Sequence, residues 1–405
     1  MKSNYKKLGN YIREVNKRDT DKKVTKLLGV SIRKVLMPSI ANIIGTDMST
    51  YKIIKKNQFA YGPVTSRNGD KISVALLDEY EEAIVSQAYT VFEVIDKNEL
   101  LPEYLMMWFR RPEFDRYARF KSHGSAREIF GWDEMCDTEL PIPHIEKQKE
   151  IVKEYHILVD RIELNNQLIT KLEETAQTIY KQWFVDFEFP DENGLPYKSN
   201  GGEMIESELG EIPKGWKLKN IKSWGNVITG KTPSSSNPNF FGNDMLFVTP
   251  GDFKNYGKYV LGAYRKLSKS GIANLKNKVL KVNSVIVTCI GSDMGKIVLT
   301  REECITNQQM NSIEPKEEFY SDYLYYYLTS ISSELKSIAL GGSTMPMINK
   351  TDFELIEILM PDDSLLQEFH RILNPINNTT WNNAKITNAS SNLKDLLLSK
   401  LATIN

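Results

Sequence analysis

Short sequence motifs recur in the same order at a nearly constant spacing, and this internal repeat constrains the fold more than any other feature of the chain. The segment Leu140–Pro143 matches Ile358–Pro361 at an offset of 218 residues, and Ile84–Gln87 matches Ile305–Gln308 at an offset of 221. Chance could supply one such match, but hardly an ordered series of them. The sequence therefore predicts two related copies, residues 1–187 and 219–405, joined by a linker at 188–218.

Copy one is predicted to end in a long helix. Residues on one face follow the alternating spacing of four and three that is typical of a coiled-coil seam. They are Ile151, Tyr155, Leu158, Ile162, Asn165, Ile169, Leu172, Ala176, Ile179 and Trp183. Asn165 is a polar residue within this seam, of the kind that fixes the register of a coiled coil at some cost in stability.

A weaker seam follows Pro361 in copy two. It consists of Leu366, Phe369, Leu373, Ile376, Thr380, Asn383, Leu397 and Leu401. Pro375 and the polar stretch 377–392 predict that the middle of this second helix is loose. We expect the two seams to bury each other in an antiparallel coiled coil; the alternative is that each helix packs on its own globular domain.

The sequence predicts an α+β protein with two pseudo-symmetric domains of mixed α/β structure, separated by the two long helices. The β-branched run Ser284–Ile290 indicates a strand, and segments 104–114 and 320–335 indicate helices. We place the first domain at residues 1–145, the first helix at 146–187 and the linker at 188–218. The second domain then covers 219–362 and the second helix 363–405.

The charges of the chain balance overall, with 52 basic and 52 acidic side chains, but they are unevenly distributed. Residues 1–40 carry eleven Lys or Arg and three Asp or Glu, and residues 251–281 carry eight and one. Basic regions of this kind are typical of phosphate contact with nucleic acid. A plain solvated surface gives similar counts, so charge alone leaves both interpretations open.

Composition excludes several classes of protein. The three cysteines, Cys136, Cys289 and Cys304, lie far apart, and the four histidines form no metal-binding motif, which argues against a disulfide framework or a metal centre. The charged N-terminal segment is unlike a signal peptide, and no stretch approaches the roughly 18 apolar residues of a membrane span. We therefore expect a cytoplasmic protein.

Catalytic motifs are weak in this sequence. Gly225–Thr232 matches the phosphate-binding pattern G-x-x-x-x-G-K-[ST], but Pro233 and Pro238 follow at the point where that motif requires a helix. Asn237–Phe240 is the nearest approach to the loop of an amino-group methyltransferase, and its third residue is wrong. The sequence thus favours a non-catalytic protein with two related binding domains.

The polar loops contain the side chains that recognise base edges. Asn and Gln pair bidentately with adenine, and Arg or Lys pairs with guanine. Such residues occur in Arg67-Asn68, Ser86-Gln87, Asn307–Gln309 and Gly342–Thr344. Because the Ser-Gln and Asn-Gln positions recur in both copies, they could equally satisfy backbone groups within each domain. Loops that differ between the copies, such as 230–256, are the better candidates for sequence-specific contact.

Taken together, five motifs resemble the specificity subunit of type I restriction-modification systems. They are LPIPHIEKQKEI (140–151), WFVDF (183–187), LGEIPKGW (209–216), GKTPS (230–234) and TNQQ (306–309), and the resemblance spans the whole chain. It implies two target-recognition domains, each followed by a long helix, and an antiparallel coiled coil that docks two modification subunits. The weak seam around 377–392 departs from that pattern.

The resemblance also implies the chemistry of an assembled complex. The modification subunits would bring S-adenosylmethionine and methylate adenine in double-stranded DNA. Two restriction (motor-nuclease) subunits would add translocation and cleavage driven by ATP with Mg²⁺. This chain itself would bind no cofactor and no metal, and it would not be an enzyme.

Two groups of residues are candidates for these roles. The residues expected to contact DNA are Lys22, Lys34, Arg67, Asn68, Gln87, Arg127, Lys231, Thr232, Ser234, Asp252, Lys254, Asn307, Gln308, Ser343 and Thr344. The residues expected in the coiled coil or against partner subunits are Ile151, Leu158, Ile162, Asn165, Ile169, Leu172, Trp183, Phe369, Ile376 and Leu397.

A bipartite target follows as a hypothesis. The 32 steps from Ile151 to Trp183 span about 48 Å as a helix, more than the ~34 Å between half-sites one DNA turn apart. The target would be asymmetric because the two recognition loops differ. Two alternatives remain: a fused nuclease or methyltransferase, and a coiled-coil scaffold that bridges partners without recognising DNA.

Overall fold

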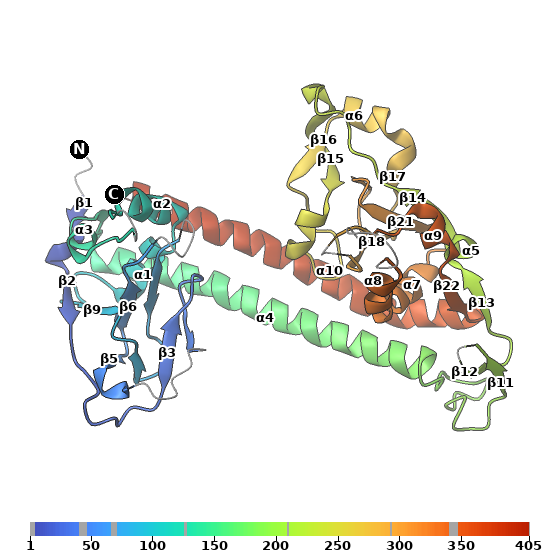
Figure 1. Ribbon diagram of the computed structural model, residues 1–405, viewed down its shortest axis with the longest axis horizontal. Helices are drawn as coiled ribbons and strands as arrows, with labels where there is room; N and C mark the ends of the chain where they lie inside the picture. Colours follow the sequence, from blue (N-terminus) through green and yellow to red (C-terminus); the bar gives the residue numbers. More distant parts are fainter. Residues whose placement is uncertain are drawn as a thin grey trace. The chain divides into compact units, whose positions relative to one another are not determined.

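The computed structural model describes residues 5–39, 47–65, 71–124, 128–208, 210–291, 294–339 and 347–404. The chain divides into two compact units, each of which combines a globular domain with part of both long helices (Figure 1). Unit 1 comprises Met1–Glu163 and Ala389–Asn405, and unit 2 comprises Leu164–Asn388.

Unit 1 contains two four-stranded sheets, with strand orders β2-β9-β6-β7 and β4-β3-β8-β5, and the separate antiparallel pair β1-β10. Within the sheets only β3 and β8 run parallel. The strands are β1 (Tyr5–Lys7), β2 (Ile12–Val15), β3 (Leu27–Val30), β4 (Leu36–Pro38), β5 (Lys52–Lys55), β6 (Gln58–Gly62), β7 (Ser73–Leu76), β8 (Glu82–Val85), β9 (Thr90–Val94) and β10 (Glu139–Pro141).

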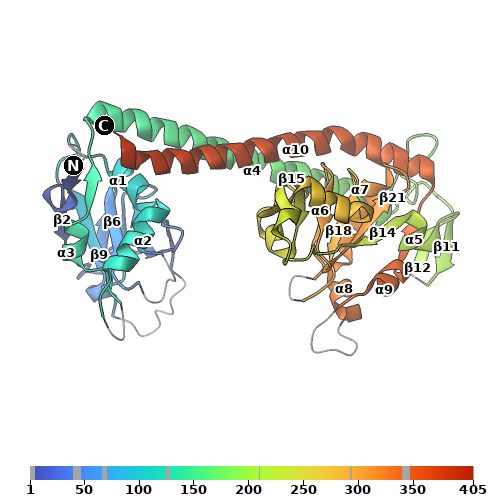
Figure 2. The ribbon, with the colours of Figure 1, turned by 90° about the horizontal axis from the view of Figure 1, so that it is seen from above.

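The main core of unit 1 lies between the sheet β2-β9-β6-β7 and three helices, α1 (Pro102–Phe109), α2 (Pro112–Lys121) and α3 (Trp132–Cys136). Figure 2 shows α1 and α2 beside β6 and β9. The predicted single helix 104–114 is divided, because Pro112 begins a new helix and disfavours helical geometry in the residue before it. Phe59 and Phe92 stack at 4.7 Å, and Phe109 contacts both rings edge-on.

Unit 2 repeats this arrangement strand for strand. Its sheets have the orders β14-β21-β18-β19 and β16-β15-β20-β17, and β13 pairs with β22. The strands are β13 (Lys217–Asn220), β14 (Gly225–Thr229), β15 (Phe241–Val248), β16 (Arg265–Leu267), β17 (Val279–Leu280), β18 (Val285–Thr288), β19 (Ile297–Leu299), β20 (Cys304–Thr306), β21 (Met310–Pro315) and β22 (Glu357–Met360). The predicted strand at 284–290 is therefore confirmed as β18, which is buried along its length.

The matched motifs occupy matched positions in the two units. Ile84 lies on β8 opposite Leu27 of its parallel neighbour, and Ile305 lies on β20 opposite Phe247 of its own. The phenol of Tyr104 donates a hydrogen bond of 3.0 Å to the carbonyl of Pro141, and Tyr323 does the same to Leu359 at 2.5 Å. The predicted internal repeat is therefore confirmed as a repeat of topology and of local contacts.

The remaining elements are a hairpin, short helices and 3-10 helices. The predicted helix 320–335 is divided into two helices, at 320–330 and 332–339. Unit 2 contains the hairpin β11 (Met204–Ser207) and β12 (Gly210–Pro213) and the helices α5 (Ile221–Trp224), α6 (Lys269–Asn274), α7 (Tyr320–Ser330), α8 (Ser332–Ala339) and α9 (Lys350–Leu355). The 3-10 helices are η1 (Leu8–Asn10), η2 (Met48–Thr50), η3 (Pro238–Phe240), η4 (Pro250–Asn255), η5 (Lys276–Lys278) and η6 (Leu401–Thr403).

Two long helices, α4 (Ile145–Phe184) and α10 (Asp363–Lys400), contact each other within both units. In unit 1, Ile151 near the start of α4 shares a core with Leu398 near the end of α10. In unit 2, Trp183 near the end of α4 packs against Phe369 near the start of α10, with ring centres 5.8 Å apart. The helices are therefore antiparallel within each unit, as the two seams predicted.

The prediction of a loose middle in the second helix is wrong, because α10 is continuous from Asp363 to Lys400. Pro375 is exposed, so the backbone hydrogen bond that it removes lies on the solvent side. Asn377 is buried and donates 2.7 Å to Asp322 of α7, which explains why the helix tolerates a polar residue there.

Asn165 provides a test of polar burial in the seam. It is only 6% exposed, and no described residue accepts a hydrogen bond from its Nδ2. We expect Asn165→Leu to raise the free energy of unfolding by about 1–2 kcal/mol, because an unsatisfied buried amide is replaced by an apolar group. Denaturant unfolding of the purified chain measures the change. Asn166→Leu is the matched control at the exposed neighbouring position and should stay within about 0.5 kcal/mol of the original protein. An unchanged or lower stability for Asn165→Leu would contradict the interpretation.

Candidate nucleic-acid interface and helix pair

In unit 2, the loop that follows β14 meets the turn that follows β20. Lys231 N donates 2.9 Å to the carbonyl of Thr306, and the hydroxyl of Thr232 donates 2.6 Å to Oε1 of Gln308. Lys231, Ser234 and Gln308 are exposed, and Thr232 is half-buried. The structure thus brings three predicted DNA contacts, Lys231, Thr232 and Gln308, into one polar surface cluster, named here the unit 2 loop cluster.

Glycine is required where the two loops of this cluster approach each other. A Cβ at Gly230 would lie 2.1 Å from the carbonyl oxygen of Asn307 and 2.3 Å from the hydroxyl of Thr306. Any larger residue would push the 230–234 segment away from the 306–309 turn. The same segment follows a strand and begins no helix, so the phosphate-binding geometry that the local sequence suggests is missing here.

Two residues predicted to contact DNA are instead buried and hold the loops. Oδ1 of Asn307 accepts a hydrogen bond from Gln309 N at 3.1 Å, and its Nδ2 donates to the Gln309 side chain at 3.0 Å. Asp252 accepts from the backbone and hydroxyl of Thr249 at 2.8 and 2.7 Å and from Tyr264 N at 2.9 Å. Both side chains are satisfied locally, so we reassign Asn307 and Asp252 from base contact to loop support.

Exposed cations lie on and after the supported loop in the sequence. Lys254 is exposed on η4, two residues beyond Asp252, and Lys266, Lys269 and Lys276 are exposed farther along the chain. Lys281 is paired with Glu314, which neutralises part of the basic region. The basic excess of residues 251–281 is therefore mostly at the surface, where it can contact phosphates.

The corresponding turn of unit 1 follows β8. Gln87 is exposed there, while the hydroxyl of Ser86 accepts from Ala88 N at 3.3 Å. In the loop between β2 and β3, the carboxylate of Asp19 accepts hydrogen bonds from the backbone N–H groups of Lys23 and Val24, at 3.1 Å each. Gln87 thus has the placement of Gln308 in unit 2, whereas Ser86, like Asn307, supports its own turn.

The two lysines predicted to contact DNA in unit 1 differ in placement. Lys22 is exposed and lies 3.1 Å from Asp47. Hydrogen bonds from Ser49, with a smaller contribution from Lys22, lower the pKa of Asp47 to about 2. Lys34 is instead buried, with its ammonium 2.7 Å from Asp115, and burial lowers its pKa below the ordinary lysine value. Lys34 therefore forms a buried ion pair within the globular domain. We correct its predicted role from DNA contact to structural support.

The other candidates fall into two groups. Arg67, Asn68, Arg127, Ser343 and Thr344 lie outside the described residues. The predicted helix residues lie as the seam pattern requires. Ile151, Asn165, Trp183 and Phe369 are buried, and Leu158, Ile162, Ile169, Leu172, Ile376 and Leu397 are half-buried.

Sequence reasoning missed an apolar groove on the helix pair of unit 1, with a volume of about 350 Å³. Its lining residues are Glu154, Ile157, Leu158, Leu393, Leu396, Leu397 and Lys400. Ile157 is 57% exposed and Leu396 50%, and both lie in this one groove, so their exposed apolar surface is clustered. The available signal was the presence of apolar residues outside the seam, at Ile157, Leu393 and Leu396.

A buried polar network, also missed, joins the globular domain of unit 2 to its helices. The ammonium of Lys258, on the loop after η4, donates 2.8 Å to the phenol of Tyr326 on α7 and 2.8 Å to Oδ1 of Asn377 on α10. It lies 3.9 Å from Asp322, whose other oxygen lies 2.7 Å from Nδ1 of His370. The side chain of Lys258 is 2% exposed, so this cation belongs to the domain–helix junction.

The ionisation of this network follows from its contacts. Burial alone would raise the pKa of Asp322, but the hydrogen bond from His370 and the charge of Lys258 hold it below the ordinary value. The hydrogen bond to Asp322 raises the pKa of His370, against the effect of partial burial. Burial lowers the pKa of Lys258, opposed by Asp322 and Glu173. Asp322 is therefore the anion around which the network forms.

Within the described ranges, no helix has the length and apolar character needed to cross a bilayer, and no three His, Cys, Asp or Glu side chains are grouped as a metal site.

Comparison with known proteins places these features in context. The family model described as the type I restriction modification DNA specificity domain matches residues 15–174 and 213–389. The type I restriction enzyme HindI specificity subunit of Haemophilus influenzae is 28% identical over 421 residues, covering 91% of this chain and 90% of that protein. The MjaIX specificity subunit of Methanocaldococcus jannaschii is 29% identical, but over only 45% of this chain and 43% of its own length.

A solved structure shares the fold. The crystal structure of the S subunit of a type I restriction-modification system from M. genitalium has a TM-score of 0.62, at 13% identity. The match covers 98% of this chain and 95% of that one. At this identity the likeness concerns the fold alone, and it agrees with the repeated α+β domains and the two long helices.

The His370–Asp322 contact predicts a pH-dependent stability. Because the folded-state pKa of His370 is raised above its ordinary value of 6.5, its stabilising contact is fully present below that value and is lost as the pH rises through the folded-state pKa. We expect the original protein to exceed His370→Gln in free energy of unfolding by about 1 kcal/mol at pH 6, and by less at pH 8.5.

Denaturant unfolding at both pH values measures this difference. Glu318 and Arg301 also act on His370, in opposite directions, so both should be left intact. His156→Gln, the same change at an exposed position on α4, is the matched control, and as a surface substitution it should stay within about 0.5 kcal/mol of the original protein. A difference that grows toward pH 8.5 would show that the charged imidazole is not the stabilising form.

Proposed function

The chain belongs to the type I restriction-modification DNA specificity family, and on that premise we propose that it recognises a bipartite, asymmetric target in double-stranded DNA and directs adenine methyltransferase subunits to it. Each globular domain would recognise one half of the target. The helix pair would hold the two recognition domains and dock the modification subunits, with the bases between the half-sites left unread.

The observation that carries this proposal is the duplicated topology with unlike exposed loops. In each unit a turn follows the strand that pairs in parallel, β8 in unit 1 and β20 in unit 2. That turn exposes a glutamine, which is Gln87 in unit 1 and Gln308 in unit 2. The residues around these glutamines differ: Gln308 lies between Asn307 and Gln309 and accepts a hydrogen bond from Thr232, whereas Gln87 lies between Ser86 and Ala88. Two domains of one fold with different loops are suited to two different half-sites.

The chemistry of the complex would reside in the partners. Modification subunits would supply S-adenosylmethionine and transfer its methyl group to adenine, and two restriction subunits would use ATP and Mg²⁺ for translocation and cleavage. This chain would contribute target choice and position. Exposed lysines such as Lys254 and Lys22 would add salt-dependent phosphate contact, which the partners' own surfaces reinforce.

The rival function is a scaffold that bridges partners without recognising DNA. It accounts for the helix pair and the apolar groove, but it gives no role to the exposed polar loops. A fused nuclease or methyltransferase would require activity from the purified chain alone. Recognition of DNA is the proposal that uses both the loops and the helices.

Methylation mapping tests the proposed function. Co-expression with the adenine methyltransferase partner should methylate one bipartite motif genome-wide. Gln308→Ala should relax or weaken recognition in one half only, and Gln87→Ala in the other, since each side chain lies on a different domain; loss of a base contact costs about 1–3 kcal/mol. Exchange of residues 230–256 should replace the half that Gln308 affects.

The control is Gln182→Ala, the same change at an exposed site on α4. It should leave both halves intact. A stable complex that methylates no defined motif would exclude recognition and leave the scaffold. A single variant that alters both halves at once would contradict the assignment of one half-site to each domain.

The groove on the helix pair of unit 1 is the proposed site for an apolar helix of a modification subunit. Its aliphatic walls lie between Glu154 and Lys400, so a helix with an apolar stripe and mixed charges at its edges would fit. We expect Leu396→Asp and Ile157→Asp each to weaken the complex by about tenfold or more, because a carboxylate would be buried against the partner.

Light scattering on co-purified complexes measures this loss. Val282→Asp is the control, because Val282 is exposed to a similar extent but lies outside the groove. Both groove variants should retain the thermal stability of the original chain when studied alone. Complexes of undiminished stoichiometry with both groove variants would place the docking site elsewhere.

A further inference from the structure

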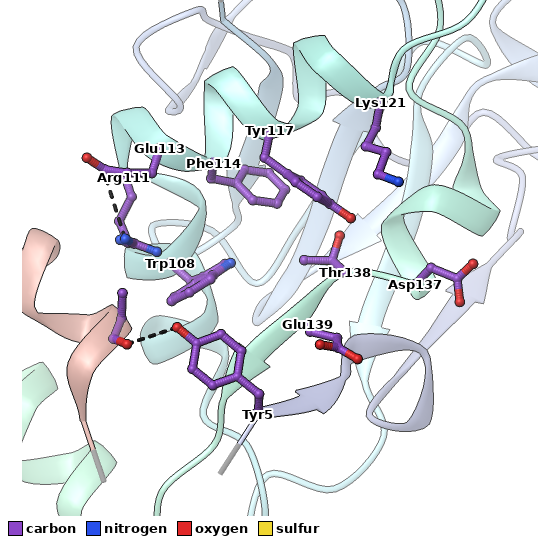
Figure 3. A pocket seen from close by; sticks show the side chains of 11 residues that line it. Tyr5, Trp108, Arg111, Glu113, Phe114, Tyr117, Lys121, Asp137, Thr138 and Glu139 are labelled. Carbon is purple, nitrogen blue, oxygen red and sulfur yellow. Dashed lines mark hydrogen bonds and ion pairs between the residues drawn. The ribbon is translucent and has the colours of Figure 1, made fainter. Parts of the chain in front are cut away.

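Unit 1 contains a second pocket, distinct from the loops and from the groove, with a volume of about 480 Å³. Figure 3 shows its walls. Tyr5 of β1 and Trp108 of α1 lie on one side, and Phe114, Tyr117 and Lys121 of α2 lie on another. Arg111, Glu113, the segment 137–139 and Ala402 complete the lining. The volume lies within the range of pockets that hold small ligands or anchoring side chains.

Two deeply buried polar side chains in this pocket have donors without partners. Trp108 is 6% exposed and Arg111 is 5% exposed. Neither Nε1 of Trp108 nor Nε of Arg111 has a hydrogen-bond acceptor among the described residues. Buried donors in folded proteins are nearly always paired, so these two indicate an acceptor that another molecule supplies.

The position of the indole directs one of these donors into the pocket. In Figure 3 the nitrogen-bearing edge of Trp108 faces the side on which Tyr117 and Thr138 lie. The Arg111 guanidinium covers the face of the same ring, 4.2 Å from its centre. Tyr5 packs edge-on against Trp108 at 6.3 Å and donates its phenol hydrogen to the carbonyl of Ala402. The ring is thus held in place with its N–H turned toward the hollow.

The charges of the lining disfavour a phosphate. Glu113, Asp137 and Glu139 face the pocket together with the cations Arg111 and Lys121. Lys7, outside the lining, pairs with Asp137 at 2.9 Å, and Glu113 lies 3.6 Å from Arg111. The acids therefore balance the cations. Nucleotides and DNA need an excess of positive charge, which this site does not offer.

A neutral aromatic group with a carbonyl fits what remains. The walls are aromatic rings, which favour offset or edge-on packing with another ring. The free N–H of Trp108 requires an acceptor such as a peptide carbonyl. Unit 2 contains the same kind of ring packing just after the end of α4, where Phe187 and Trp216 pack edge-on with ring centres 5.6 Å apart.

We propose that this pocket binds an aromatic anchor residue of another polypeptide, with its ring between the aromatic walls and a main-chain carbonyl accepting from Nε1 of Trp108. The partner is thus a peptide segment that presents an aromatic side chain and a main-chain carbonyl. The site is independent of DNA recognition, so its failure and that of the proposed function are separable.

The test uses N-acetyl-L-tryptophanamide as the probe and the full-length chain as the protein. Saturation-transfer NMR and calorimetry measure binding. We expect Trp108→Phe, which keeps a ring but removes the N–H, to weaken binding about fivefold, as the loss of one hydrogen bond does. Tyr117→Phe, a milder change to the wall that Trp108 faces, should weaken it to a smaller extent.

Controls on both molecules make the outcome decisive. Phe120→Ala removes an exposed ring of α2 outside the lining and should not change binding. N-acetyl-L-alaninamide, which lacks the ring, and adenosine 5′-monophosphate, which carries a base and a phosphate, should not bind. The proposal is overturned by no binding of the probe to the original protein, by binding undiminished in Trp108→Phe, or by equal binding of either control compound.

Discussion

The arrangement of unit 2 depends on the contacts of the buried Lys258 ammonium, which join a loop of the globular domain to α7 and α10. Removing a cation from water costs several kcal/mol, and only good geometry with further hydrogen bonds offsets this cost. Here the partners of Lys258 come from two helices, α7 and α10. Tyr326 and Asn377 accept the hydrogen bonds, and Asp322 supplies the charge from 3.9 Å. Because a displaced loop would leave this charge unpaired, the loop after η4 has one position relative to α7 and α10.

That fixed position connects the helix pair to the candidate DNA surface. Lys258 lies four residues after Lys254, on the segment that Asp252 caps, and its neighbour Tyr259 packs edge-on against Trp381 of α10 at 5.7 Å. The exposed residues of this segment therefore project from a loop fastened at its base. Preorganised loops lose less conformational entropy on binding, which favours specific recognition over loose electrostatic attraction.

The sequence predicted what depends on periodicity and order. The repeat and the seam from Ile151 to Trp183 follow from spacing alone, and both are confirmed. It failed where the partner of a polar side chain does not follow from the residue type, whether that partner is distant or close in the sequence. Asn377 suggested a loose helix because its partner, Asp322, is 55 residues away. Asp252 and Asn307 suggested base contact, since a polar side chain that caps its own loop has the same residue type as one that faces DNA. Ile157 and Leu396 can be recognised in the sequence as apolar residues outside the seam. That they line one groove follows from the pairing of α4 with α10, which the sequence spacing does not give.

The composition of unit 1 has a consequence for how the protein is made. Its core combines Ile151 and Tyr155 with Leu398 and Leu401, and the phenol of Tyr5 bonds to the carbonyl of Ala402 across 397 residues of sequence. A ribosome thus synthesises nearly all of the second copy before it releases the residues that close the core of unit 1. Contacts so distant in sequence form late and carry a large loop-closure entropy. Until then the apolar start of α4 remains uncovered, and a chain interrupted near its end would expose that surface to aggregation and to proteases.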